Sequence, residues 1–387
     1  MTLAFASCFA MRRAILPTLV GMALLGSCGG NDAPASPGPT QPSDLDVTTL
    51  VGGFDTIWDL AWAPDNTIWV TERGGQISRV NPASGAVTRM GSVAVSEIGE
   101  GGLMGLAFHP DFANGQPWIY VAHTYTSNAG VRNRVVRLAA SSTALGAPEV
   151  LLDNLPGSSI HNGARLAIGP DRLLYVTLGD ASNTSLPQDR ASLGGKILRL
   201  ILTGAPAPGN PFGNAVFSYG HRNPQGLVFL PGGALYATEH GPSDNDEVNR
   251  IEVGRNYGWP NVRGACDGDA GPAEVPFCQA NNVATPLAMW TPTIAPAGID
   301  YYGSTRIPQW TGSLLFTTLK GEALYRLTLS ADGRSVTGRE TLFAGTHGRL
   351  RDVLVAPDGT VYLGTSNRDG RGSPRGEDDR IVRIRAR

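Results

Sequence analysis

One short unit recurs along the chain, and it constrains the fold more than any other feature. Each copy has an apolar segment, a turn with proline before Asp or Gly, and a second apolar segment rich in Tyr, Trp, Val and Thr. The turn prolines lie 46, 60, 61 and 126 residues apart, and they are Pro64, Pro110, Pro170, Pro231 and Pro357. The last spacing leaves room for one more unit. Residues 312–329 supply it as a degenerate copy without the Pro-Asp turn.

This repeat predicts a ring of small β-sheets. The chain has 50 glycines and 28 prolines, and long helices are excluded because Gly costs about 1 and Pro about 3 kcal/mol inside a helix. Six units of four short strands are typical of a six-bladed β-propeller with four-stranded antiparallel blades. We therefore predict an all-β fold with one propeller domain over residues 47–387, and functional loops gathered at one face of the central channel.

The first residues indicate export. Arg12 and Arg13 precede an apolar run over residues 14–25, which has the length of a signal peptide and is too short to span a membrane. The run ends in Leu-Gly-Ser-Cys28, as in a bacterial lipoprotein cleavage box, so we predict a signal peptide over residues 1–27 and a lipid anchor at Cys28. The alternative is an ordinary secretory signal with an incidental Cys28. Translation could start at Met1 or Met11.

The mature protein is expected in the periplasm or at the outer membrane or cell surface as a lipoprotein. Residues 28–46 are rich in Pro and Ser and predict a tether without core material. No apolar run reaches 18 residues, so no transmembrane span is expected. In an oxidising compartment, Cys266 and Cys278 predict a disulfide across a loop of Gly, Asp and Pro. The formal net charge of −2 gives no reason to expect a nucleic-acid partner.

Polar residues gather between the predicted strands. The clusters are IHNGARLAIGPD (160–171), YGHRNPQGL (219–227), EHGPSDNDEVN (239–249), NYGWP (256–260), Lys320 and GRLRD (348–352). In this order they resemble the soluble quinoprotein sugar dehydrogenases, the glucose/sorbosone dehydrogenase-like family, over residues 54–383. GHRNPQGL and HGPSDNDEVN at this spacing, inside a sixfold repeat, are the most specific part of the resemblance.

The resemblance implies a propeller that binds pyrroloquinoline quinone (PQQ) and calcium, and that oxidises aldose sugars at C1 to the lactone with an external electron acceptor. PQQ carries three carboxylates and an ortho-quinone, so its site needs cations, and planar Arg forks suit carboxylates. By resemblance, Arg222 and Asn223 contact the quinone oxygens. Lys320, Arg349 and Arg351 hold the carboxylates.

The sugar hydroxyl must lose a proton as hydride leaves C1. The resemblance implies that His161 is the general base, because imidazole titrates near neutral pH. Asp180 is the acid expected to orient it, and Arg222 is the third catalytic residue. The alternative is a His161 that is only a polar turn residue. His109 and His221 are expected to be structural.

Calcium prefers hard oxygen ligands, including backbone carbonyls. By resemblance, the calcium ion that bridges to PQQ is held by the carbonyls of Gly241 and Pro242. A second, structural calcium is expected at Glu247 and Tyr257. The alternative for this acidic segment is a solvated turn.

One position departs from the family pattern. Where the family has GQGGL, this chain has GEGGL, with Glu100 at the position that contacts cofactor or substrate. A carboxylate beside an anionic cofactor is costly unless it is protonated, turned away or paired.

Two other classes of function stay open. A propeller lactonase or related metal-dependent hydrolase would hold a divalent metal, with Glu72, Asn223 and Asp180 as candidate ligands. A non-catalytic ligand-binding propeller lipoprotein would need none of the cations.

Overall fold

The structure is a computed structural model that describes residues 43–387. The predicted signal peptide, Cys28 and most of the predicted tether lie outside the described residues. Strand β1 (Leu45–Gly52) includes the last two residues of that tether. Leu45 and Asp46 therefore belong to the sheet. Within the described part of the chain, no helix is long and apolar enough to cross a membrane.

Six four-stranded antiparallel sheets form the blades of a propeller, as the repeat predicted. Blade one contains β2 (Ile57–Trp62), β3 (Ile68–Glu72), β4 (Gln76–Val80) and β5 (Val87–Ser92). Blade two contains β6 (Leu103–Phe108), β7 (Trp118–Ser127), β8 (Gly130–Ala139) and β9 (Glu149–Pro156). Blade three contains β10 (Gly163–Ile168), β11 (Leu174–Leu178), β12 (Lys196–Leu200) and β13 (Val216–Tyr219).

The second half of the chain completes the ring. Blade four contains β14 (Pro224–Phe229), β15 (Leu235–Glu239), β16 (Asp246–Ile251) and β17 (Ala288–Trp290). Blade five contains β18 (Pro296–Tyr302), β19 (Ser313–Thr318), β20 (Leu324–Leu329) and β21 (Val336–Leu342). Blade six contains β22 (Leu350–Val355), β23 (Val361–Thr365), β24 (Arg380–Ala386) and the N-terminal strand β1. Short 3₁₀ turns lie at Phe112–Asn114 and Pro308–Trp310.

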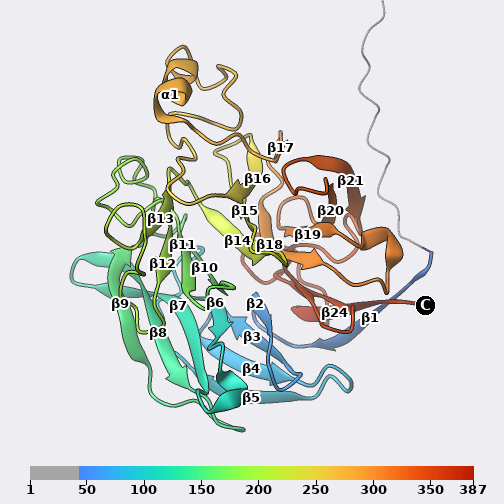
Figure 1. The fold of residues 1–387 in the computed structure, drawn as a ribbon. Coiled ribbons are helices and arrows are strands. Elements are labelled where there is room, and N and C mark those ends of the chain that lie inside the picture. Colours follow the sequence, from blue (N-terminus) through green and yellow to red (C-terminus); the bar gives the residue numbers. More distant parts are fainter. Residues whose placement is uncertain (1–42) are drawn as a thin grey trace, which may run out of the picture. The chain divides into compact units, whose positions relative to one another are not determined.

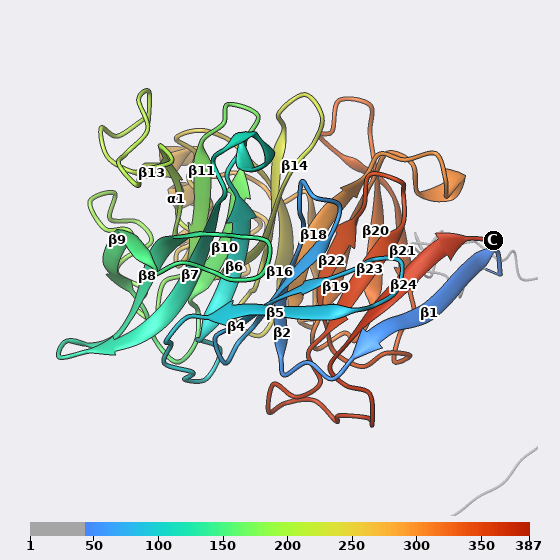
Figure 2. The same cartoon turned by 90° about the horizontal axis from the view of Figure 1, so that it is seen from below.

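The first strands of successive blades contact one another and surround the channel (Figures 1 and 2). The ring is closed because β1 pairs antiparallel with β24, from Leu45 opposite Ala386 to Gly52 opposite Arg380. Pro64, Pro110, Pro170, Pro231 and Pro357 lie between the first and second strands of blades one, two, three, four and six. Blade five has the longer connection over residues 303–312, where the degenerate copy lacks the turn.

Every first strand has a register shift near its start against the second strand. Such bulges re-aim side chains at the beginning of a strand. Three bonds of 2.7 Å also join neighbouring blades across the channel wall: Leu106 N to Asp59, Leu60 N to Asp352, and Val355 N to Asp300. The channel is thus fixed by hydrogen bonds between blades, and the bulges point side chains into one end of it.

The connection from β16 to β17 is an insert outside the propeller pattern, and it carries α1 (Glu274–Asn281; Figure 1). The predicted disulfide between Cys266 and Cys278 is confirmed. The buried Glu274 carboxylate accepts hydrogen bonds from the backbone N–H groups of Arg263, Gly268 and Ala270 at 3.0, 2.7 and 3.1 Å. Disulfide and carboxylate together hold the insert in one shape.

Candidate active site

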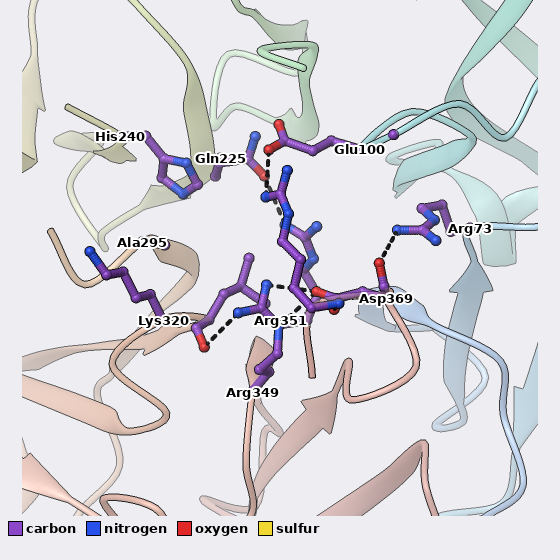
Figure 3. A pocket seen from close by; sticks show the side chains of 12 residues that line it. Arg73, Glu100, Gln225, His240, Ala295, Lys320, Arg349, Arg351 and Asp369 are labelled. Carbon is purple, nitrogen blue, oxygen red and sulfur yellow. Dashed lines mark hydrogen bonds and ion pairs between the residues drawn. The ribbon is translucent and has the colours of Figure 1, made fainter. Parts of the chain in front are cut away.

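A pocket of about 210 Å³ opens at the end of the channel where the first strands begin (Figure 3). Seven of its lining side chains are charged: Arg73, Glu100, Lys320, Arg349, Arg351, Asp369 and Arg371. Five of them are cations and two are carboxylates, so the pocket carries three positive charges. His240 also lines it, and burial lowers the pKa of this imidazole.

The predicted cations Lys320, Arg349 and Arg351 therefore lie around one cavity. Both Nε and Nη2 of Arg349 contact one carboxylate oxygen of Asp369, at 2.8 and 2.7 Å. Nη1 of Arg351 donates to Gln225 at 2.8 Å, and its Nε is buried with no partner in residues 43–387. Burial lowers the pKa of Arg351 to about 10. A bound anion would relieve that desolvation and satisfy the orphaned donor.

Glu100 lines the same pocket and is paired. One carboxylate oxygen accepts from Arg371 at 3.0 Å and the other from the backbone N–H of His161 at 3.2 Å. Burial raises the pKa of Glu100, but His240, the His161 N–H and Arg371 outweigh burial and lower it. The unusual carboxylate is therefore ionised and neutralised by an arginine from the β23–β24 loop.

His161 and Asp180 form a hydrogen-bonded pair beside Glu100. Nδ1 of His161 lies 2.8 Å from Oδ1 of Asp180, which also accepts from Ser182 N at 2.7 Å. A carboxylate can only accept, so Nδ1 carries the proton and Nε2 keeps its lone pair. Within residues 43–387, Nε2 has no hydrogen-bond partner. This is the tautomer that a general base needs.

The backbone around His161 is under strain. His161 has a φ of +61°, a left-handed conformation that residues other than glycine rarely adopt and that costs about 1–3 kcal/mol. Gly179, just after β11, approaches so closely that a Cβ there would lie 2.0 Å from the His161 carbonyl oxygen. Only glycine permits the approach that brings Asp180 beside the imidazole.

Arg222 and Asn223 connect this pair to His240. The carbonyl of Arg222 accepts from Asp180 N at 2.8 Å, and its Nη1 donates to the His240 carbonyl at 3.2 Å. Its Nε is another buried donor without a partner in the described chain, and burial lowers the pKa of Arg222. Asn223 is fully buried, with Oδ1 accepting from Gly163 N at 3.0 Å. Its contact with a quinone stays a prediction.

A second, smaller cavity of about 20 Å³ brings together all four predicted metal-site residues, Gly241, Pro242, Glu247 and Tyr257. A Cβ on Gly241 would lie 1.9 Å from the Asp244 carbonyl oxygen, so this turn requires glycine. Burial and the neighbouring Glu239 carboxylate raise the pKa of Glu247 well above its usual range. The carboxylates of the buried Glu239 and the half-buried Glu247, with several carbonyls around one small space, form a donor set that suits a hard cation.

Five polar side chains that line the large pocket were not predicted as site residues: Arg73, Gln225, His240, Asp369 and Arg371. A signal existed for Gln225, since it follows Asn223 by two residues in the same way as Arg351 follows Arg349. His240 lies in the EHGPSDNDEVN segment, whereas Arg73, Asp369 and Arg371 are not in segments with a readable pattern.

The candidate ligands of a hydrolytic metal are not arranged as such a site. Glu72 accepts from Asp55 N at 2.7 Å, pairs with Arg89, and lines a different pocket from Glu100. Asp180 is used by His161. In the described part of the chain, no group of three or more His, Cys, Asp or Glu side chains is placed to hold a metal ion.

Comparison with curated proteins gives relatives of similar length. The chain is 32% identical to quinoprotein glucose dehydrogenase B of Acinetobacter calcoaceticus, over 85% of this chain and 87% of that protein. It is 30% identical to an aldose sugar dehydrogenase of Escherichia coli, over 85% of this chain and 92% of that protein.

Solved structures agree with these relatives. The PQQ-bound form of an aldose sugar dehydrogenase from Streptomyces coelicolor is 39% identical with a TM-score of 0.77, and the match covers 90% of this chain and all of that one. A sequence model of the glucose/sorbosone dehydrogenase family matches residues 54–378. The resemblance drawn from the motifs is thereby confirmed, and the chain belongs to the glucose/sorbosone dehydrogenase family.

Proposed function

We propose that this protein oxidises aldose sugars at C1 to the lactone, with His161 as the general base. The observation that carries the proposal is the His161–Asp180 pair, which leaves Nε2 free and is hydrogen-bonded through the His161 N–H to Glu100 in the wall of the cationic pocket. The quinoprotein relatives support PQQ as the cofactor.

The pocket fits PQQ in charge and in hydrogen-bonding capacity. Its three surplus positive charges match the three carboxylates of the cofactor. The buried Nε atoms of Arg222 and Arg351, which have no partner in residues 43–387, are donors that an oxygen-rich ligand would satisfy. Among residues 43–387, Nζ of Lys320 donates only to Thr293 Oγ1, at 2.8 Å, so its charge is available. Lys320, Arg349 and Arg351 would hold the carboxylates, and Arg222 and Asn223 the quinone end.

Bound PQQ supplies the acceptor for the electrons that leave C1, and an external electron acceptor is then needed for turnover. His161 takes the C1 hydroxyl proton on Nε2, which makes the ring an imidazolium. Asp180 stabilises that cation through Nδ1–H and fixes the direction of Nε2. The strained backbone and Gly179 hold His161 beside Glu100, which lines the pocket, so less orientational freedom has to be lost in the transition state.

Calcium belongs to the proposal as well. The carbonyls of Gly241 and Pro242 would hold one ion near the cofactor, and Glu247 with the Tyr257 carbonyl would hold a structural one. The small shared cavity and its oxygen donors support this assignment.

The place of action is also proposed from the leader. Residues 1–27 direct export, and Cys28 carries a lipid in the periplasm or on the outer membrane or cell surface. Radioactive palmitate incorporation that disappears in Cys28→Ala would test this, and unchanged incorporation would contradict it.

Reconstitution tests the function directly. The apo-protein is mixed with PQQ and Ca²⁺, and dye reduction is followed with a panel of aldoses, with and without EGTA. We expect reduction that needs both additions and gives the aldonolactone. Arg351→Ala should weaken PQQ binding, measured by titration of the quinone absorbance, by about tenfold or more, since a charged hydrogen bond contributes about 1.5–3 kcal/mol.

The control is Arg339→Ala, which removes an arginine stacked on Trp290 outside the pocket. It should bind PQQ like the wild type. No dye reduction with any aldose and no quinone spectrum on the protein would refute the proposal, and lactone hydrolysis without PQQ would favour the hydrolase instead.

A further inference from the structure

The NYGWP segment stood out in the sequence, but neither the base nor the cofactor contacts account for its tryptophan. We propose that Trp259 is a positioning residue that fixes the general base His161 by holding the second oxygen of Asp180. The inference deepens the proposed function and rests on the role of His161 in it.

The hydrogen bonds run in one line from the insert to the imidazole. Nε1 of Trp259 donates to Oδ2 of Asp180 at 2.8 Å, and Oδ1 of the same carboxylate lies 2.8 Å from Nδ1 of His161. The two oxygens of Asp180 therefore have separate tasks. Because Asp180 is 1% exposed, water does not substitute for either contact.

An indole suits this task because its N–H can only donate and has no rotatable hydrogen. A carboxylate held at one oxygen alone can rotate about its Cβ–Cγ bond. A donor at each oxygen fixes its plane, and that plane sets the direction of the imidazole. The imidazole in turn sets the direction of Nε2.

Trp259 is itself held at both ends of its peptide. Its N–H donates to the Gly220 carbonyl at 2.9 Å, and its carbonyl accepts from Gln188 Nε2 at 2.8 Å. Its ring also lies under the guanidinium of Arg222, 5.3 Å from the ring centroid. The tryptophan thus contacts two of the three predicted catalytic residues and stands next to the disulfide-stapled insert.

The N–H also tunes charge. A donor on Oδ2 withdraws electron density from Asp180 and lowers its ability to stabilise the imidazolium. Removing that donor should raise the pKa of His161, because the carboxylate then interacts more strongly with the protonated ring. Loss of the donor should therefore change both the orientation and the titration of the base.

Trp259→Phe separates the hydrogen bond to Asp180 from the stacking on Arg222, since phenylalanine keeps an aromatic face and removes the N–H donor. We expect kcat to fall about tenfold with little change in KM, because misplacing a reacting group costs up to ~10²-fold. The lower pKa of the pH–rate profile should move up. Trp290→Phe is the matched control, because Trp290 also lies under an arginine, 5.3 Å from Arg339, and lies outside the pocket. It should leave both quantities unchanged.

The second measurement does not depend on cofactor or activity. The histidine ring resonances of the apo-protein are titrated by NMR, and His161 is assigned by its absence from the spectrum of His161→Ala. We expect the His161 midpoint to rise in Trp259→Phe and to stay at the wild-type value in Trp290→Phe. A failure of the proposed sugar oxidation would leave this result standing, and the two proposals can therefore fail separately.

A double-mutant cycle tests whether Trp259 acts on the rate through Asp180. If Trp259 acts through Asp180, Trp259→Phe combined with Asp180→Asn should be no slower than Asp180→Asn alone. Should Trp259→Phe not fold, Trp259→His, which keeps a ring N–H, should give a smaller rise in the same direction. Additive losses in the cycle, or a His161 titration that matches the wild type, would overturn the proposal.

Discussion

Two histidine–carboxylate pairs of nearly the same geometry serve opposite purposes in this molecule. His161 lies 2.8 Å from Asp180, and His221 lies 2.9 Å from Glu239, both through Nδ1. The His161 side chain is 13% exposed and its Nε2 is free among residues 43–387, whereas the His221 side chain is fully buried and its Nε2 lies 2.8 Å from Ser218 Oγ. A carboxylate partner alone does not make a base. A free, reachable second nitrogen does.

The buried pair even has the order of a hydrolase triad, with serine, histidine and carboxylate in line. Ser218 and His221 are 0% exposed, and His221 stacks on Tyr257 with ring centroids 4.5 Å apart. No substrate can reach the serine in this packing. The pair instead holds Glu239, whose other oxygen accepts from the Arg222 N–H. The prediction that His221 is structural fits this arrangement.

Of the four changes predicted below, removal of the accessible base should have the largest effect. His161→Ala should lower kcat about 10³-fold, within the ~10²–10⁴ that a general base contributes. PQQ affinity should stay within about threefold, because the imidazole does not line the cationic pocket. Steady-state kinetics and a quinone titration measure the two quantities, and a variant with a wild-type rate would remove His161 from the mechanism.

Removing the buried histidine should do the reverse. His221→Ala takes the hydrogen-bond partner from Ser218 Oγ and from one oxygen of the Glu239 carboxylate, which should lower the free energy of unfolding by about 3 kcal/mol. The rate of the folded fraction should fall less than tenfold. Urea unfolding and kinetics on the same preparation test this. Undiminished stability with a large loss of rate would mean that the two pairs have been assigned the wrong way round.

The His161–Asp180 pair has one more carboxylate beside it, that of Glu100. Glu100→Gln keeps an acceptor for the His161 N–H, removes a negative charge from the pocket and releases Arg371 for a ligand. We expect PQQ to bind about fivefold more tightly, since two unit charges about 4 Å apart interact by about 1 kcal/mol when water screens them. Weaker binding in the quinone titration would show that the Glu100–Arg371 pair shapes the pocket instead.

His347 differs from His161 and His221, because no carboxylate of residues 43–387 is its hydrogen-bond partner. Burial and the nearby Arg380 and Arg375 lower the pKa of His347 from 6.5 to about 4. The unfolded chain binds this proton near pH 6.5 and the folded protein only near pH 4, so stability contributed by His347 is lost as the pH falls between these values. His347→Asn should lose less in Tm than the wild type from pH 7 to pH 4. Parallel Tm curves would contradict this, and the effect should be the smallest of the four.

The fold was predictable because its signal is repeated. Five of the six blades contain the same turn, and the copy over residues 312–329, which lacks it, could still be placed by the spacing of the others. The pairing of β1 with β24 could not be predicted in this way, since β1 precedes the first Pro-Asp unit and resembles no other strand.

The site was predictable only where the functional residues stand in their own motif. Arg222 and Arg351 lie in such segments. Asp369 and Arg371 come from a polar loop whose spacing has no period, and they reach the pocket only because blade six meets blade one. Trp259 was visible in NYGWP, but its partner lies 79 residues away, and that contact arises only after the insert folds back over blade three.

The pairing of β1 with β24 in blade six determines when the ring can close. Among residues 43–387, the outermost strand of this blade is the first to be synthesised, and the strand that it must pair with, β24, is the last. Strand β1 has no pairing partner before β24 is present, so the ring can close only after residue 380 has been made. Loss of a few residues from the C-terminal end would therefore uncover the beginning of the chain.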